Sequence, residues 1–281
     1  MPASNTRALD KARDLAADGL IFDLEDAVAP DAKRTARDNV AQALAAGGYG
    51  RRELILRVNA LATEWGHVDL AAAAVMPLDG VLLPKVESAD AVRQAEAVLT
   101  AAGVPERLAI WCMIETPRGV LRAEDIAASS PRLGGLVMGT SDLTNDLRAR
   151  QTRDRQPLLT SFGISLLAAR ACGLAILDGV HLDLADDEGF LAACRQGREL
   201  GFDGKTLIHP KTIAAANAAF GPSVEEVAWA RRIIAAHGEA VAGGKGIVLV
   251  DGRLIENLHV EGARQVVALA DAIALLDAGQ R

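Results

Sequence analysis

Short apolar runs alternate along the chain with longer segments in which apolar residues recur every three or four positions. The runs predict seven β-strands, at 19–23, 53–59, 80–85, 108–115, 135–140, 175–181 and 204–209. The segments between them predict helices at 31–46, 63–76, 89–102, 118–129, 158–171, 186–200 and 210–219. This alternation is typical of parallel strands connected by helices, so the sequence predicts an α/β domain.

Seven strands are one fewer than a closed parallel barrel needs. The chain opens with MPASNTRALDKARDLAADG, which predicts a loop and a helix with no strand before them. Two interpretations remain open at this point. Either the sheet is open, or it is a barrel that has lost its first strand.

The pattern changes after residue 220. Residues 223–242 form an amphipathic helical segment that ends in glycines, and a short hairpin-like piece and a helix at 260–277 follow. Pro222 and the Gly243–Gly244 pair are typical of the boundaries between such elements. We therefore expect two domains, the main one at 1–220 and a C-terminal extension at 221–281. The apolar faces of the extension would pack on the same chain or on a neighbouring subunit.

Composition narrows the range of partners. A chain of 281 residues with 50% hydrophobic content can bury a large core, and its net charge of −7 comes from interspersed acids and bases. Nucleic acid and membranes are therefore not expected as partners, and no stretch approaches the roughly 20 apolar residues of a spanning helix. Three widely spaced cysteines in apolar surroundings indicate buried thiols in a reducing compartment, so we expect a cytoplasmic protein.

Charged side chains follow five consecutive predicted strands. They are Glu25 and Asp26, then Arg57 with Asn59, then Lys85 with Glu87, then Glu115, and finally Asp142. A single acid at such a position is most often a helix cap, but capping does not explain an arginine inside the apolar run LILRVN. Barrel enzymes place their chemistry at this end of the strands, so we expect an active site there.

The types of residue indicate the chemistry. Carboxylates without a converging His or Cys cluster suit a hard cation such as Mg²⁺, and Glu115 and Asp142 are the natural pair. Zinc is not expected, because the histidines show no HxH or HExxH spacing. The sequence also lacks GxSxG and GxGxxG, and Cys112 is interpreted as a buried core thiol.

Seven motifs carry a resemblance that spans almost the whole chain. They are FDLEDAVAP, LRVNA, LLPKVES, MIETPRGV, GTSDLTNDL, LDGVHLDLADDEGF and GFDGKTLIHPKTI. In order and spacing they resemble the HpcH/HpaI aldolase and citrate lyase β-subunit family, in its CitE-like branch of malyl-CoA lyases and thioesterases. The resemblance implies a TIM (β/α)₈-type barrel, with the first strand apparently missing from this chain, and a C-terminal helical extension.

The resemblance also implies roles for individual residues. Glu115 and Asp142 are expected to hold Mg²⁺, with Mn²⁺ as an alternative, and Arg57 is expected to contact the reacting acyl group. Glu25 and Asp26 are expected to bind metal waters and to position Arg57.

The substrate implied is a coenzyme A thioester. Its contacts are expected from Arg57, from Gly139, Thr140 and Ser141 of the GTSD motif, and from Lys205, His209 and Pro210 of GKTLIHP. Two interpretations stay open for Lys205, which would contact the nucleotide or pair with an acid of the barrel. Asp23 is interpreted as forming a structural hydrogen bond inside the barrel.

One further motif departs from the family pattern. Lyase and synthase relatives commonly carry an acid/base Asp that reaches a neighbouring subunit's site, and this chain has Glu256 there. The extra methylene moves the carboxylate by about an ångström, a displacement that can cost about a hundredfold in rate.

The main functional hypothesis is a Mg²⁺-dependent lyase that cleaves a 3-hydroxyacyl-CoA such as malyl-CoA to acetyl-CoA and glyoxylate, or runs the reverse condensation. The alternatives are a malyl-CoA thioesterase that releases malate and CoA, and a citrate lyase β subunit that acts on a carrier-protein thioester. A non-catalytic paralogue is disfavoured, because it has no need for an unpaired metal site at the barrel rim. The resemblance also implies a homo-oligomer, a trimer or hexamer.

Overall fold

All seven predicted strands are present in the computed structural model, which describes residues 1–244 and 246–279. They are β1 (Gly19–Asp23), β2 (Glu53–Arg57), β3 (Gly80–Leu83), β4 (Ala109–Ile114), β5 (Leu133–Met138), β6 (Ala175–Asp178) and β7 (Gly204–Lys205). All are parallel, and their order in the sheet is their order in the chain. This winding is the one expected of a barrel, and it differs from the reversed order of an open doubly wound sheet.

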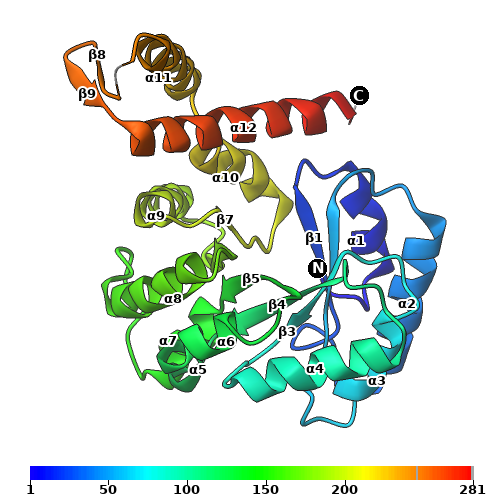
Figure 1. Cartoon of the computed structure of the whole chain (residues 1–281). Coiled ribbons are helices and arrows are strands. Elements are labelled where there is room, and N and C mark those ends of the chain that lie inside the picture. The colour runs from blue at the N-terminus through cyan, green and yellow to red at the C-terminus, as the bar shows by residue number, and fades with distance from the viewer. Residues whose placement is uncertain (245, 280–281) are drawn as a thin grey trace. The chain divides into compact units, whose positions relative to one another are not determined.

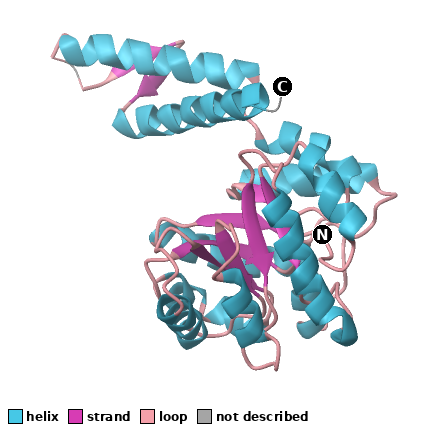
Figure 2. Ribbon diagram, turned by 90° about the vertical axis from the view of Figure 1, so that its right-hand side faces the viewer, coloured by secondary structure: helices cyan, strands magenta, loops and turns pink. Residues whose placement is uncertain are grey.

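Helices surround the outside of the curved sheet (Figures 1 and 2). They are α1 (Thr6–Lys11), α2 (Lys33–Ala46), α3 (Gly66–Ala73), α4 (Ala89–Ala101), α5 (Pro117–Leu121), α6 (Ala123–Ala127), α7 (Thr140–Asp146), α8 (Leu159–Ala171), α9 (Asp187–Leu200) and α10 (Ile213–Phe220). Short 3₁₀ turns lie at Ala12–Asp14, Pro30–Ala32, Gln156–Leu158 and Pro210–Thr212. The strand residues that face these helices, such as Phe22, Leu56 and Ile110, are fully buried. This burial on both sheet faces accounts for the apolar runs that made the strands recognisable.

The position of the missing first strand is held by Met1–Ala3. The N–H of Ala3 donates to the Asp23 carbonyl and the N–H of Asp23 donates to the Met1 carbonyl, both at 2.9 Å. The result is a single parallel bridge between Pro2 and Asp23 rather than a full strand. Of the two interpretations left open by the sequence, the barrel with a reduced first strand is the one that this arrangement supports.

The inner face of the sheet is filled by a tryptophan. Trp111 packs with Ile55, Leu82 and Val137, and a Cβ added at Gly135 would lie 2.4 Å from its ring. Strand β4 is irregular beside it, since the register with β5 shifts between Ile110 and Trp111. The ring therefore fills part of the barrel interior below the carboxyl ends of the strands.

Several strands are shorter than predicted. Strand β7 has two residues instead of six, because β6 is its only partner in the described sheet and few ladder bonds hold it. Strand β5 ends at Met138, and the predicted strand residue Thr140 instead begins helix α7. The predicted helix at 118–129 is divided into α5 and α6 at Arg122.

The chain divides into two compact units, Met1–Ala219 and Phe220–Arg281. The second contains α11 (Val224–Ala242), the antiparallel hairpin of β8 (Val248–Val250) and β9 (Arg253–Ile255), and α12 (Asn257–Gly279). Ser223 and Glu226 form a capping box at the start of α11. A small core around Ile233, Ile255 and Val260 holds this unit together.

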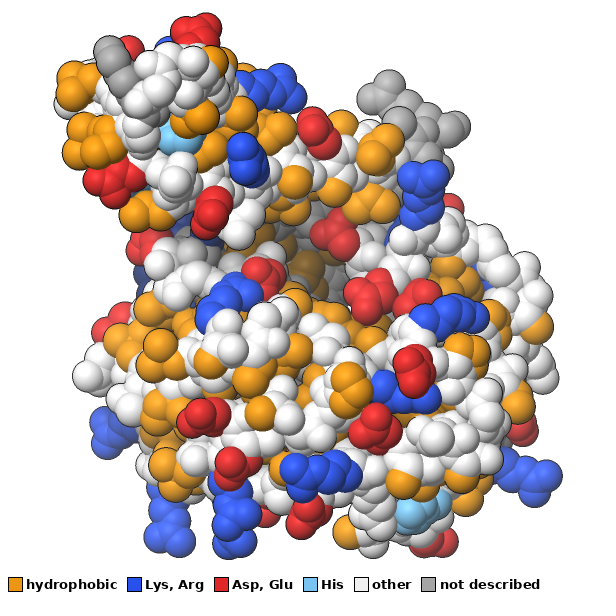
Figure 3. Space-filling view, viewed as in Figure 1, with side chains coloured by type: hydrophobic (Ala, Val, Ile, Leu, Met, Phe, Trp, Pro, Cys, Tyr) orange, Lys and Arg blue, Asp and Glu red, His pale blue; other side chains and the backbone are white. Residues whose placement is uncertain are grey.

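The surface agrees with the expectation of interspersed charge. On the face shown in Figure 3, acidic and basic side chains alternate among apolar and neutral ones. Among the described helices, none is both long and apolar enough to span a bilayer.

Candidate active site

The carboxyl ends of β1 to β5 bring the predicted charged residues together. Because these strands are consecutive neighbours in a parallel sheet, the segments that follow them lie at one edge. Arg57 ends β2 on the same face as Ile55, which packs against Trp111, so the guanidinium lies on the inner side of the sheet. The site is therefore at the open end of the barrel interior.

Arg57 is fixed by two carboxylates. Its Nε and Nη2 donate to the two oxygens of Asp23 at 2.7 and 2.5 Å, and its Nη1 lies 3.2 Å from Oε2 of Glu25. Asp23 and Arg57 are partners in the β1–β2 register, which sets this geometry. Burial alone would raise the pKa of Asp23, but its hydrogen bonds and the charge of Arg57 lower it. Both groups are therefore charged, and the arginine has one preferred orientation.

Asp23, rather than the pair Glu25 and Asp26, is the main residue that positions Arg57. Asp23 also accepts hydrogen bonds from the backbone N–H of Glu25 at 2.8 Å and of Ala27 at 3.3 Å. The predicted structural hydrogen bond of Asp23 is thus present, but its principal partner is the candidate catalytic arginine. Glu25 contributes the second contact, and Asp26 pairs with Lys85 instead.

Lys85 lies among the acids of the site. Its ammonium contacts Glu25, lies 3.3 Å from Asp26 and lies 3.5 Å from Asp142. Burial opposes its charge, but these carboxylates and Glu115 outweigh burial and raise the pKa of Lys85. The sequence placed Lys85 at the rim without assigning it a role.

Glu115 is the most deeply buried acid of the site, with 2% of its surface exposed. Burial raises its pKa to about 7, and the charge of Asp142 adds to the rise, while Lys85 opposes it. Gly139 lies directly against it, since an added Cβ would be 2.3 Å from Cβ and 2.4 Å from Oε2 of Glu115. The absence of a side chain at Gly139 is thus what makes room for the carboxylate.

These groups fit a hard divalent cation. Glu115 and Asp142 supply only oxygen atoms, and a cation beside them would remove the cost of burying the Glu115 charge. No group of three or more His, Cys, Asp or Glu side chains in the described residues forms a complete metal cage. Two carboxylates, with water and substrate oxygens at the other positions, match the usual coordination of Mg²⁺.

The GTSD motif forms the start of α7. Thr140 is buried, and its hydroxyl lies 3.4 Å from the Val180 carbonyl of the loop after β6. Ser141 and Asp142 are partly exposed in the first helical turn, beside Gly139. The motif therefore brings candidate substrate contacts and one candidate metal ligand to the same edge as Glu115.

Lys205 pairs with an acid of the barrel, which is one of the two interpretations that the sequence left open. Its side chain is fully buried, and Nζ lies 2.8 Å from Oδ2 of Asp178. Arg155 donates to both oxygens of the same carboxylate, at 2.8 and 2.7 Å. This buried network joins β6 to β7 and favours a structural role for Lys205.

His209 and Pro210 are exposed after β7. His209 caps the following 3₁₀ turn, since its Nδ1 accepts from the N–H of Lys211 at 3.1 Å. Their exposure leaves both available to a ligand, so their role at the nucleotide end stays a prediction.

Glu256 belongs to the second unit. It lies between β9 and α12, and its N–H donates to Nδ1 of His259 at 3.1 Å. Its predicted catalytic role stays a prediction.

A buried network that the sequence analysis missed supports the turn after β1. Nζ of Lys33 donates to the carbonyls of Leu24 and Glu25 and to Oδ1 of Asn59, at 2.7, 2.8 and 2.7 Å. Asn59 in turn donates to Asp69 at 2.6 Å. Asn59 of the RVN motif was the one member of this network that stood out in the sequence, and it was the only basis for predicting the network.

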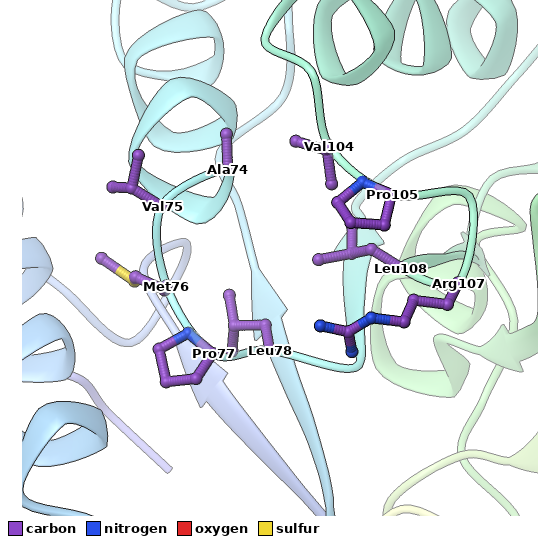
Figure 4. Close-up of a pocket in the computed structure, with 9 residues that line it drawn as sticks. All are labelled: Ala74, Val75, Met76, Pro77, Leu78, Val104, Pro105, Arg107 and Leu108. Atoms are coloured by element: carbon purple, nitrogen blue, oxygen red, sulfur yellow. The ribbon is translucent and has the colours of Figure 1, made fainter.

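The structure also has a hollow away from these acids. It holds about 310 Å³ between the Ala74–Leu78 and Val104–Leu108 segments, which precede β3 and β4 (Figure 4). It therefore lies at the amino ends of these strands, opposite the carboxylates, and its lining is mostly apolar.

Parallel strands wound in chain order, with an arginine and buried carboxylates at their carboxyl ends, indicate an enzyme of the (β/α)-barrel class. The chain belongs to the HpcH/HpaI aldolase/citrate lyase family, whose profile matches residues 1–210. The resemblance found in the sequence is thereby confirmed.

Individual relatives narrow this class. The chain is 51% identical over 274 residues to a (3S)-malyl-CoA thioesterase of Cereibacter sphaeroides, covering 98% of this chain and 94% of the relative. It is 35% identical over 297 residues to an L-malyl-CoA/β-methylmalyl-CoA lyase of that species, covering 97% and 93%. A solved structure of CitE from Mycobacterium tuberculosis, in complex with magnesium, acetoacetate and coenzyme A, matches with a TM-score of 0.79 at 31% identity and 96% coverage of both chains. The chain is therefore an enzyme of the lyase or thioester hydrolase type.

Proposed function

We propose that this protein is a Mg²⁺-dependent thioesterase that hydrolyses a 3-hydroxyacyl-CoA of the malyl-CoA type to the free hydroxy acid and CoA. The observation that carries the proposal is the 51% identity, across nearly the whole chain, to a (3S)-malyl-CoA thioesterase. The lyase relative is more distant, at 35%. This difference favours the thioesterase alternative over the lyase that the sequence analysis placed first.

The proposed roles follow from the contacts in the site. Glu115 and Asp142 would hold Mg²⁺, which supplies Lewis-acid polarisation of substrate oxygens when it is bound. Arg57, held by Asp23 and Glu25, would stabilise the oxyanion that forms on the thioester carbonyl, because its charge is fixed in advance of the reaction. Gly139, Thr140 and Ser141 would line the acyl group.

Hydrolysis needs one water molecule and no other reactant. The water oxygen bonds to the carbonyl carbon and the carbon–sulfur bond breaks. One proton of the water ends on the CoA thiolate that leaves, and the other stays with the carboxylic acid that forms. We propose that Glu25 and Asp26 orient this water, since both carboxylates lie beside Lys85 at the rim. Glu256 in place of Asp is compatible with hydrolysis, because carbon–carbon chemistry places the stricter demand on that carboxylate.

The remaining proposals concern partners and setting. We propose His209 and Pro210 as contacts for the nucleotide end of CoA, on the basis of their exposure. The second unit exposes large apolar side chains, including Val224, Leu249 and Leu258, which supports a homo-oligomer in which it acts as a lid or interface. Three free cysteines, at 112, 172 and 194, support a cytoplasmic setting.

The test is a product analysis. Purified protein is incubated with malyl-CoA and Mg²⁺, and malate, free CoA, acetyl-CoA and glyoxylate are quantified together, with EDTA and Glu115→Ala as controls. Malate and CoA in equal amounts, lost with either control, is the expected result.

Two results would overturn the proposal. Acetyl-CoA with glyoxylate as the main products would identify a lyase. Inertness toward CoA esters with turnover of a carrier-protein thioester would point to the citrate lyase β-subunit alternative.

A further inference from the structure

Lys85 has a backbone conformation that is uncommon for a residue with a side chain. Its φ angle is +49°, in the left-handed region. In this conformation its N–H donates to Oε1 of Glu115 at 2.7 Å. The strained backbone of Lys85 thus places an N–H against a buried carboxylate of the candidate site. Such strain at a site indicates that the surrounding site holds Lys85 in this conformation.

The side chain of Lys85 reaches the other acids of the site. Its ammonium contacts Glu25 and lies 3.3 Å from Asp26 and 3.5 Å from Asp142. One lysine thus neutralises carboxylates that follow β1 and β5. Asp142 is at the same time one of the two proposed ligands of the divalent cation.

We propose that the ammonium of Lys85 is a built-in counter-cation, which stabilises the acidic site without metal and competes with the metal ion for Asp142. The inference rests on the metal site of the proposed function. Like charges repel, so a divalent cation at Asp142 and an ammonium 3.5 Å from the same carboxylate raise each other's energy. When the metal binds, the ammonium keeps Glu25 and Asp26 as partners and gives up Asp142.

Two consequences follow that a merely structural lysine would not have. Without the ammonium of Lys85, no cation competes with the metal ion for Asp142, so the metal ion binds more tightly. Removal of the ammonium also leaves Glu25, Asp26 and Asp142 without their shared cation, so the metal-free protein is less stable. Saturating metal restores much of that stability, because a ligand that binds only the folded state stabilises it.

The experiment compares full-length wild type with Lys85→Met, which keeps side-chain length, and Lys85→Arg, which keeps the charge. Mn²⁺ affinity is measured by electron paramagnetic resonance, and the thermal midpoint is measured in EDTA and in saturating Mn²⁺. The matched control is Lys211→Met, because Lys211 is ion-paired with Asp187, at 2.9 Å, which is not one of the acids of the site.

Lys85→Met is expected to bind Mn²⁺ on the order of tenfold more tightly than wild type, with a lower midpoint in EDTA. Lys85→Arg and Lys211→Met are expected to retain wild-type affinity. If Lys85→Met does not fold, Lys85→Gly replaces it, because glycine relieves the positive φ angle while removing the ammonium.

A Mn²⁺ affinity of the uncharged variant that is equal to or weaker than that of wild type would overturn the inference while leaving the metal site intact. Failure of folded wild type to bind Mn²⁺ would instead overturn the metal site of the proposed function, and this inference with it.

Discussion

Asp23 and Arg57 are partners in the parallel register of β1 and β2, so the arginine is held by the sheet itself. Both Nε and Nη2 are used in this pairing, which leaves the Nη1 edge with Glu25 and the sulfur of Met113, 3.6 Å away. A guanidinium whose Nε and Nη2 are held by one carboxylate has a fixed orientation, which is the condition for stabilising a developing oxyanion.

Asp23→Asn is expected to lower kcat/KM on the order of a hundredfold, because the loose arginine stabilises the oxyanion less well. The free energy of unfolding is expected to fall by about 3 kcal/mol, since a buried charge loses its partner. Steady-state kinetics and urea unfolding measure the two effects. Asp10→Asn is the control: it removes an exposed i,i+3 pair with Arg13 and should change stability by less than about 0.5 kcal/mol. Wild-type kcat/KM in Asp23→Asn would contradict the positioning role.

Gly139→Ala is expected to abolish high-affinity Mn²⁺ binding, because the new Cβ would lie 2.4 Å from Oε2 of Glu115 and displace that carboxylate. Isothermal titration calorimetry measures the affinity. Gly163→Ala serves as the control, since Gly163 is in a helix and nothing lies within 4 Å of its added Cβ. Equal affinity in the two variants would show that Glu115 is not a ligand.

At the scale of single residues, the positions of the charged side chains of the site were predictable from the sequence, but their ion-pair partners were not. The ends of the strands identified Arg57, Glu115 and Asp142 because charge after an apolar run is conspicuous. Asp23 is the last residue of a strand, and its partner Arg57 lies 34 positions away in the sequence. Only the register of the two strands shows that they pair. Lys33 carries no local signal, because two of its three hydrogen-bond partners are backbone carbonyls and the third, Asn59, lies 26 positions away.

A buried ionic network supplements the few backbone pairs between strands β6 and β7. Their described register has two residue pairs, whereas Asp178 accepts from Arg155, Lys205 and the N–H of Gly179. The network compensates for a short edge strand with little backbone pairing.

Lys205→Met is expected to lower the free energy of unfolding by about 1–3 kcal/mol, with KM for a CoA ester unchanged. Asp178 keeps Arg155 as a partner, which limits the loss. Urea unfolding and steady-state kinetics separate the two interpretations of Lys205. A tenfold rise in KM at unchanged stability would identify it as a contact for CoA.

The presence of each strand was more predictable from the sequence than the residues at which the strands and helices begin and end. Apolar runs identified all seven strands, yet β7 stopped after Lys205 because a strand needs partners that the local sequence does not specify. Helix α7 was missed because its first residue, Thr140, was assigned to the predicted strand. Strand β5 ends at Met138, and Gly139 then packs against Glu115.

At the scale of the whole molecule, the choice of reaction is expected to depend on both units. Arg57 and Glu115 belong to the first unit, and Glu256 belongs to the second. We propose that the first unit serves binding and polarisation in the thioesterase, and that Glu256 of the second unit influences which bond breaks.

Glu256→Asp is expected to raise the share of acetyl-CoA and glyoxylate among the products of malyl-CoA, because the residue then matches the Asp that the family resemblance implies for lyases. Product ratios measured by chromatography test this, with Glu261→Asp, in α12, as the control. An unchanged ratio would show that the carboxylate at this position does not select the reaction.

The order of the strands also bears on how the site forms. The arginine and its carboxylate are 34 residues apart, and Lys85 and Glu115 are 30 apart, because each strand pairs with the one made just before it. Closing a loop of this size costs only slightly more entropy than closing a shorter one, because the cost grows slowly with loop length. The ionic framework of the site can thus form stepwise during folding, each βα unit adding its charged residue to an edge that already exists.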